Sequence, residues 1–191
     1  MRKGVVGSIV IAAFVVTVGL TAVATERQLA AQDARVEQAW ERMTSAYFDW
    51  GRLARQSLES TRVDQAAPED LLLSRQAVAS LRRTSRIASP DAMELASLGA
   101  SRRTLDEVTA RFSVAMKTEA QIPGEAYDDL IDSLAAKRRE AEAARAVFNA
   151  ETLAYNRLRR RFPTVLIALA AGFGDRPYFD EPKDTTSARD R

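Results

Sequence analysis

Three aspartates, Asp128, Asp129 and Asp132, lie close together in the second half of the chain. Carboxylates within one helical turn could coordinate a metal ion if they faced inward and neighbouring helices supplied further ligands. The di-iron motif of helical bundles requires Glu-x-x-His, however, and the sequence contains no histidine. We therefore interpret the three acids as partners of a helix N-terminus, where the helix dipole favours them, and predict no metal site.

Glu37 and Glu41 are a second carboxylate pair, one helical turn apart, that could act as acid and base. Arg35 and Arg42 lie beside them, and neither glutamate falls on the predicted apolar seam, so we interpret the pair as a solvated face. The chain has no cysteine, no histidine to activate a serine, no suggestively placed lysine, and no glycine-rich phosphate loop. The sequence therefore predicts a non-enzymatic protein without catalytic residues or cofactors.

The basic residues before a C-terminal apolar run are the best functional candidate. Residues 136–162 hold eight basic and three acidic side chains, an excess of five positive charges. Cations stabilise a helix C-terminus, but they could also bind anionic lipid headgroups, at about 1 kcal/mol per basic residue near the surface. Both interpretations stay open. The residues predicted to contact lipid or a partner are Arg157, Arg159, Arg160, Arg161, Phe162 and Phe173.

The thirteen residues 162–174 carry no charge. They are too few to cross a bilayer, which needs about 20 residues, and they are apolar on every side, unlike an amphipathic surface helix. The run could cap the membrane-proximal end of a bundle or dip into the lipid interface. We favour the cap, because Gly172-Phe173 and Pro177-Tyr178-Phe179 are typical of a chain that folds back to pack.

The net charge of +2 comes entirely from the N-terminus. Residues 1–25 carry Arg2 and Lys3 and no acid, which leaves 26 basic and 26 acidic residues in the rest of the chain. A nucleic-acid-binding domain normally shows a strong basic excess. The balanced body therefore argues against a nucleic-acid partner.

The 22 residues Gly4 to Thr25 are uncharged, which is just enough for a helix that spans a bilayer. The motif Ala22-Val23-Ala24 would also fit cleavage by signal peptidase after Ala24, but the apolar stretch is longer than a usual signal sequence. We favour an uncleaved signal anchor at residues 1–25. The positive-inside rule then keeps Arg2 and Lys3 in the cytoplasm and exports the body.

Apolar spacing predicts an all-α body at residues 26–179, followed by a disordered polar tail at 180–191. The first helix continues from the anchor to about residue 61, and the second starts at Pro68. Ser89-Pro90-Asp91 is typical of an N-cap and a new start, residues 121–124 break the third helix, and the fourth ends or kinks at Pro163. The first helix carries an apolar seam at Val36, Trp40, Met43, Tyr47, Trp50 and Ala54.

Short connections favour antiparallel neighbours, so the predicted architecture is an N-terminal transmembrane helix followed by an antiparallel up-and-down four-helix bundle. Trp40, Tyr47 and Trp50 fit its core, whereas Phe48 lies off the seam and could be an exposed contact. The fourth helix carries apolar positions as far as Phe162, and its direction would bring Phe162 back towards the membrane.

The C-terminal part resembles the LemA family of membrane-anchored bacterial helical proteins. The family ends in A-R-x-x-Y-N, Y-N, F-P, G-F and Y-F, and the counterparts here lie within residues 144–179, with Phe148 in place of a tyrosine. Ala39-Trp40 and the segment 119–123 are looser matches, and the family's R-R-x-D-L-I-P-N-L-V segment is not recognisable in residues 44–60. The resemblance implies a membrane anchor, an antiparallel helical bundle and no established enzymatic activity.

We therefore expect a single-pass, non-enzymatic protein of the bacterial inner membrane, with its body on the extracytoplasmic side. Its partners would be membrane lipid and an envelope protein that the sequence does not identify, and homo-oligomers stay open. The alternative is a sensor or adaptor that binds a small ligand within the bundle. Such sensors usually continue to a second transmembrane helix and a signalling domain.

Overall fold

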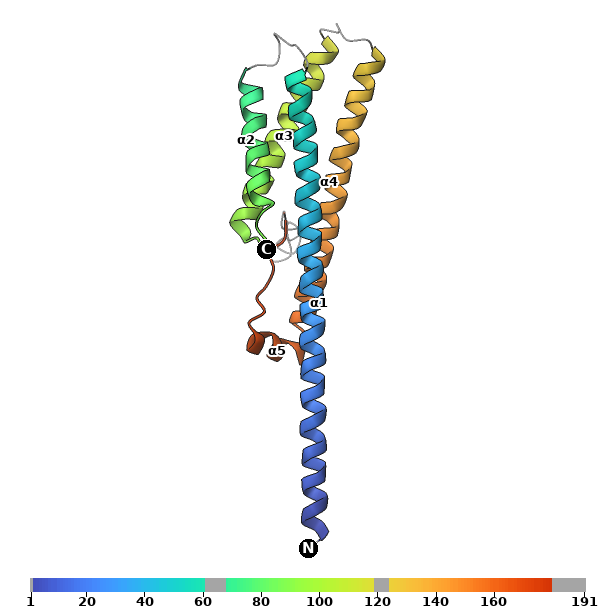
Figure 1. Cartoon of the computed structure of the whole chain (residues 1–191), viewed down its shortest axis with the longest axis vertical. Helices are drawn as coiled ribbons and strands as arrows, with labels where there is room; N and C mark the ends of the chain where they lie inside the picture. Colours follow the sequence, from blue (N-terminus) through green and yellow to red (C-terminus); the bar gives the residue numbers. More distant parts are fainter. Residues whose placement is uncertain (1, 61–67, 119–123, 180–191) are drawn as a thin grey trace, which may run out of the picture. The chain divides into compact units, whose positions relative to one another are not determined.

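The computed structural model describes residues 2–60, 68–118 and 124–179, with their side chains at 20–60, 68–117 and 127–179. These residues form helices and no strand, as predicted (Figure 1). The helices are α1 (Arg2–Ser60), α2 (Pro68–Thr84), α3 (Ala92–Thr118), α4 (Gly124–Arg159) and α5 (Thr164–Ala171).

The chain divides into two compact units. The bundle unit comprises Glu37–Ala150 with Pro177–Arg191, and the terminal unit comprises Met1–Val36 with Glu151–Arg176. The long helices α1 and α4 each contribute to both units.

In the bundle unit, parts of α1 and α4 pack with α2 and α3, and successive helices run in opposite directions (Figure 1). Pairs of residues joined by a hydrogen bond or an ion pair establish the direction, because the residue number falls along one helix as it rises along its neighbour. These pairs are Trp40–Ile87 and Glu59–Arg75, Asp70–Arg111 and Ser80–Ser97, and Arg102–Glu142 and Ser113–Tyr127. The unit is therefore an up-and-down four-helix bundle.

The predicted seam of α1 is confirmed, since all six of its residues from Val36 to Ala54 are buried. Trp40 shows how the seam joins its neighbours: its ring centre lies 5.7 Å from that of Phe148 on α4. Its indole Nε1 donates a hydrogen bond of 2.6 Å to the Ile87 carbonyl, beyond the end of α2. Phe48, which lies off the seam, is half-buried.

The N-cap of α3 is Asp91, not Ser89 as predicted. The Asp91 carboxylate accepts from the amides of Met93 at 2.7 Å and Glu94 at 2.9 Å, and the Glu94 carboxylate accepts from the Asp91 amide at 2.6 Å. This reciprocal arrangement satisfies amides that have no partner within the helix. Asp91 is the better cap because it directly precedes the first residue of the helix, Ala92.

Replacing Asp91 with alanine removes the acceptor for two of these amides. We expect the free energy of unfolding to fall, because the helix loses its N-cap. Urea unfolding followed by circular dichroism measures this change. Asp91→Asn keeps an acceptor oxygen and serves as the control; an equal loss in both variants would contradict the capping role.

Helix α4 ends shortly before Pro163, as predicted, but Phe162 is not an apolar bundle position. The helix stops at Arg159, and Phe162, which was predicted as an apolar bundle position, is 82% exposed. Pro163 has no amide hydrogen and restricts the residue before it, so the chain turns here and the helical spacing no longer directs Phe162 inward. The Phe162–Pro163 peptide bond is cis.

The apolar run after this turn forms the short helix α5. It ends at Gly172, whose φ of +78° lies in the left-handed region that glycine adopts without strain. The Phe173 amide donates to the Ala168 carbonyl at 2.9 Å, which closes the last turn. Eight of the thirteen uncharged residues thus form a capped helix. Helix α5 belongs to the terminal unit, and its role as a cap on the end of the bundle stays a prediction.

The predicted anchor at residues 1–25 falls mainly on side chains outside the described part, although the α1 backbone begins at Arg2. Among the residues described, no helix combines the length and the apolarity needed to cross a bilayer. The predicted polar tail at 180–191 also lies outside the described residues.

Candidate functional site

The predicted lipid-contact residues lie at the end of α4 and around α5, within the terminal unit. Arg157, Arg160, Arg161 and Phe162 are exposed, and Phe173 is half-buried. Arg159 differs from its neighbours, because only 17% of its side chain is exposed. Its guanidinium donates to the Phe173 carbonyl and to the Asp175 carboxylate, both at 2.8 Å. Arg159 therefore links α4 to residues 173–175, the start of the segment that follows α5.

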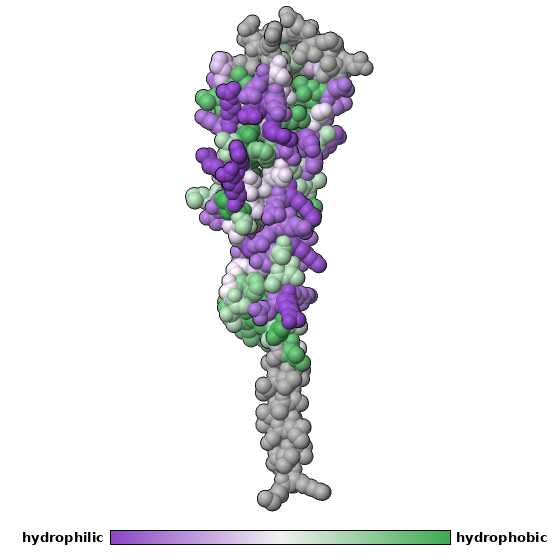
Figure 2. All heavy atoms as spheres, viewed as in Figure 1, coloured by the Kyte–Doolittle hydropathy of each residue, from purple (hydrophilic) through white to green (hydrophobic). Residues whose placement is uncertain are grey.

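Helix α5 has one buried side and one apolar side that faces outward. Thr164 and Ala168 are buried, whereas Leu166 is 59% and Leu169 67% exposed. Together with Phe162, these two leucines define the α5 apolar surface. On α1 of the same unit, Leu20 and Val23 are exposed as well. Figure 2 shows apolar residues gathered over α5 and the adjoining part of α1.

A hydrogen-bonded clamp fixes the tail that follows α5. The buried Asn156 side chain donates to the Arg176 carbonyl at 2.8 Å and accepts from the Arg176 amide at 3.0 Å. The Arg176 guanidinium in turn forms two bonds of 2.8 Å to the Asp33 carboxylate on α1. The Tyr155 hydroxyl donates to the Gly174 carbonyl at 2.9 Å. The prediction that the chain folds back after α5 is thus confirmed. Hydrogen bonds and an ion pair hold residues 174–176 against α4 and α1.

Asn149 makes the same kind of clamp in the bundle unit. Its side chain donates to the Phe179 carbonyl at 2.9 Å and accepts from the Phe179 amide at 3.0 Å. The Phe179 ring is fully buried, with its centre 6.0 Å from that of Tyr47. Phe179 is therefore a core residue of the bundle unit, and it comes from the segment that follows α5.

The sequence reasoning missed the roles of Asn149, Asn156, Asp33 and Arg176, although a signal was present. Asn149 and Asn156 are the only asparagines in the chain, and each directly follows a buried aromatic residue of α4.

The acidic candidates are not brought together into a site. Asp128, Asp129 and Asp132 are exposed, and they lie beyond the first turn of α4, which begins at Gly124, so the predicted N-terminal placement is wrong. Glu41 is exposed and Glu37 is half-buried. No group of three metal-ligating side chains occurs among the residues that the structure describes.

Among the residues that the structure describes, Tyr47 in the bundle unit is a strongly perturbed titratable group. Its hydroxyl donates to the Glu142 carboxylate at 3.1 Å. Burial, followed by the negative charge of Glu142, raises the pKa of Tyr47 well above its usual value. Arg102 and Arg145 contact the same carboxylate at 3.1 and 2.9 Å and balance its charge. The cluster holds α1, α3 and α4 together.

This raised pKa predicts a loss of stability at alkaline pH. An unfolded tyrosine ionises near pH 10, so the stabilisation from neutral Tyr47 is fully present below about pH 10 and falls as the pH rises towards the folded pKa. We expect the free energy of unfolding to drop by about 1 kcal/mol more between pH 9 and 11 in the wild type than in Tyr47→Phe. Urea unfolding at both pH values measures this difference; equal drops would contradict it.

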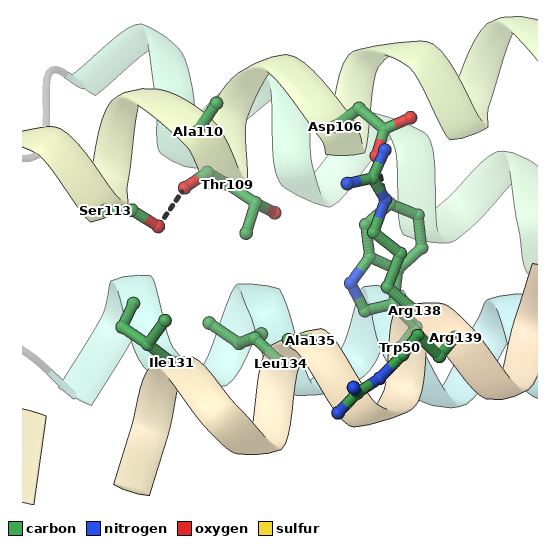
Figure 3. A pocket seen from close by; sticks show the side chains of 10 residues that line it. All are labelled: Trp50, Asp106, Thr109, Ala110, Ser113, Ile131, Leu134, Ala135, Arg138 and Arg139. Atoms are coloured by element: carbon green, nitrogen blue, oxygen red, sulfur yellow. Dashed lines mark hydrogen bonds and ion pairs between the residues drawn. The ribbon is translucent and has the colours of Figure 1, made fainter. Parts of the chain in front are cut away.

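Cavities lie among the helices of the bundle unit, and two of them have linings suited to a ligand. One, of about 320 Å³, is lined by α3 and α4 residues together with Trp50 of α1 (Figure 3). Its lining is mostly apolar, and it includes two buried polar atoms without a hydrogen bond, Nε1 of Trp50 and Oγ1 of Thr109. The other lies between α1 and α2 and is bordered mainly by arginines.

A family model described as the LemA family matches residues 62–190, about two thirds of the chain. No curated protein and no solved structure matches the sequence. The matched segment includes α2 to α5, the two asparagines and the clamped tail, as well as residues 144–179, which carry the resemblance seen in the sequence. The chain therefore belongs to the LemA family.

Proposed function

We propose that the protein is a non-enzymatic scaffold of the bacterial envelope, anchored in the inner membrane by residues 1–25. The terminal unit would rest on the lipid, and the bundle unit would present its surface to another envelope protein. The absence of histidine and cysteine from the sequence supports a non-enzymatic role, because the commonest acid–base and nucleophilic groups are missing.

The exposed α5 apolar surface is the observation that carries this proposal. Leu166 and Leu169 on α5 are 59 and 67% exposed, and Phe162, just before α5, is 82% exposed. Hydrogen bonds from Asn156 and Arg159 tie the residues after α5 to α4. Contiguous exposed apolar side chains mark a contact with a membrane or a partner. The same unit contains the uncharged stretch Gly4–Thr25, so the segment that would enter the bilayer and the α5 apolar surface belong to one compact body.

The basic residues around α5 add electrostatic support. Arg157 and Arg161 are exposed, and Arg160 is 67% exposed while its guanidinium lies 3.4 Å from Asp175. Arginines beside an apolar surface are suited to anionic headgroups, at about 1 kcal/mol each. Arg159 takes no part in this contact, because its guanidinium binds the tail. By the positive-inside rule, Arg2 and Lys3 would face the cytoplasm and the body would be exported.

Extraction of bacterial membranes tests the anchor. The full chain is expected to stay in the membrane pellet after a carbonate wash at high pH, whereas a chain without residues 1–25 is expected to be released. A reporter fused to the C-terminus should be active only outside the cytoplasm. Release of the full chain by carbonate, or a cytoplasmic reporter signal, would refute this part of the proposal. Sequencing the mature N-terminus separates an anchor from a signal peptide cut after Ala24.

A second candidate function is a sensor or adaptor that binds a small ligand, and the cavity in Figure 3 favours it. The unpaired Nε1 of Trp50 could donate to a ligand oxygen, with Ile131 and Leu134 contacting its apolar part. A ligand retained in native mass spectrometry, and lost in Leu134→Trp, would support this function. A reproducible protein partner without a ligand would support the scaffold.

A further inference from the structure

Six arginines border a single cavity in the bundle unit, between α1 and α2. The cavity has a volume of about 420 Å³. Phe48 and the buried Val78 supply its apolar lining. Its arginines are Arg52 and Arg55 from α1, and Arg75, Arg82, Arg83 and Arg86 from α2 and the residues after it.

Two carboxylates offset only part of this charge. Asp49 lies 3.3 Å from Arg52, and Glu59 lies 3.0 Å from Arg75 and 4.0 Å from Arg55. Six positive and two negative groups leave an excess of four positive charges at one cavity. The chain from residue 26 onward is formally neutral, so this excess is a local concentration of charge.

The arginines also have unused hydrogen-bonding capacity. Arg82, Arg83 and Arg86 make no ion pair within the part of the chain that the structure describes. The Nε atom of Arg55 is buried and makes no hydrogen bond, and its ion-pair partner, the Glu59 carboxylate, lies 4.0 Å away. Arginines at the end of α2 would favour its dipole, but that effect does not explain Arg52, Arg55 and Arg75, which lie within helices. A buried unsatisfied donor is costly unless a partner binds there.

The chemistry of the cavity selects a class of ligand. Guanidinium groups bind phosphate oxygens through paired hydrogen bonds, and several of them are needed to neutralise more than one phosphate. A volume of about 420 Å³ falls within the range of small-molecule sites. We propose that this cavity binds a small phosphorylated molecule with at least two phosphate groups, whose organic part lies against Phe48. This site is distinct from the α5 apolar surface and does not depend on the scaffold function.

Calorimetric titration of the full chain in neutral detergent tests the proposal, with pyrophosphate and ADP as probes and adenosine as the uncharged comparison. We expect saturable binding of pyrophosphate and ADP, one per chain, that weakens as salt rises, and no binding of adenosine. Replacing Arg82, Arg83 and Arg86 together by glutamine should weaken both ligands by about tenfold or more, since charge-assisted hydrogen bonds are lost.

The matched control replaces Arg42, Arg103 and Arg139 by glutamine, which removes the same charge from exposed arginines outside this cavity. Its affinities should stay within about threefold of the wild type, while Phe48→Ala should weaken ADP more than pyrophosphate. Circular dichroism confirms folding of each variant.

The proposal is overturned if neither phosphate probe binds saturably or both triple variants lose affinity equally. Tighter binding of heptaglutamate than of ADP would instead identify an acidic protein segment as the occupant.

Discussion

Replacing Trp40 with alanine is expected to lower the free energy of unfolding by about 4 kcal/mol. The indole is 1% exposed, it packs against Phe148, and its Nε1 donates to the Ile87 carbonyl. Truncating a buried tryptophan typically costs about 3–5 kcal/mol, because packing contacts are lost and a cavity remains. For a chain of this size, the melting temperature should fall by roughly 10 °C, measured by circular dichroism in detergent.

Two further variants show how much of the lost free energy of unfolding comes from the indole donor and how much from burial of the ring. Trp40→Phe keeps an aromatic ring but removes the indole donor, so it should retain more of the stability than Trp40→Ala does. Met93→Ala truncates a side chain that is 74% exposed and should change the free energy of unfolding by less than about 0.5 kcal/mol. An effect of Trp40→Ala no larger than that of Met93→Ala would show that Trp40 does not anchor the bundle.

The second large effect is expected for Asn156→Ala, which removes both hydrogen bonds that hold the Arg176 backbone. Losing these bonds leaves a donor and an acceptor of the tail unpaired, at a combined cost of about 3 kcal/mol. The tail should then open locally while the helices stay folded. We expect the protection of the Arg176 amide against hydrogen exchange to fall by about a hundredfold, measured by mass spectrometry of peptides covering residues 172–176.

Leu153→Ala is the matched control, since it truncates a partly exposed side chain on the same helix without touching the tail hydrogen bonds. It should leave protection of residues 172–176 unchanged. Unchanged protection in Asn156→Ala would mean that the Asp33–Arg176 pair and the Tyr155 bond hold the tail without the asparagine.

The parts of the fold that depend on local pattern were predicted from the sequence. The seam from Val36 to Ala54 repeats at the helical period, so it identified the buried side of α1 without knowledge of its neighbours. Pro68 likewise marked the start of α2, because proline is favoured in the first turn.

Predictions failed where backbone geometry overrides periodicity. The spacing along α4 continues as far as Phe162, but the turn before Pro163 takes the backbone out of the helix and leaves that ring exposed. At the start of α3, both Ser89 and Asp91 are suitable N-caps by residue type. Which of them caps the helix depends on where the helix begins, and Asp91 directly precedes its first residue, Ala92.

The candidate site was predicted in part. The sequence drew attention to the arginines at 157–161, but it did not distinguish Arg159, whose guanidinium binds the tail, from its exposed neighbours. That difference depends on a contact with Phe173, fourteen residues later. The cavity bordered by six arginines was also missed, because its residues come from two separate helices whose packing no local spacing reveals.

The proposed contact between α5 and lipid can be measured directly, since a chain without cysteine accepts a single label at any chosen position. Nitroxide labels at Leu169→Cys and, as the control, at Met93→Cys would be compared in nanodiscs of anionic lipid by electron paramagnetic resonance. We predict that the Leu169 label collides with oxygen more than with an aqueous nickel complex, at the depth of about 5–10 Å where interfacial helices lie, while the Met93 label stays in water. Equal access of the nickel complex to both labels would contradict a lipid-facing α5 and the scaffold arrangement built on it.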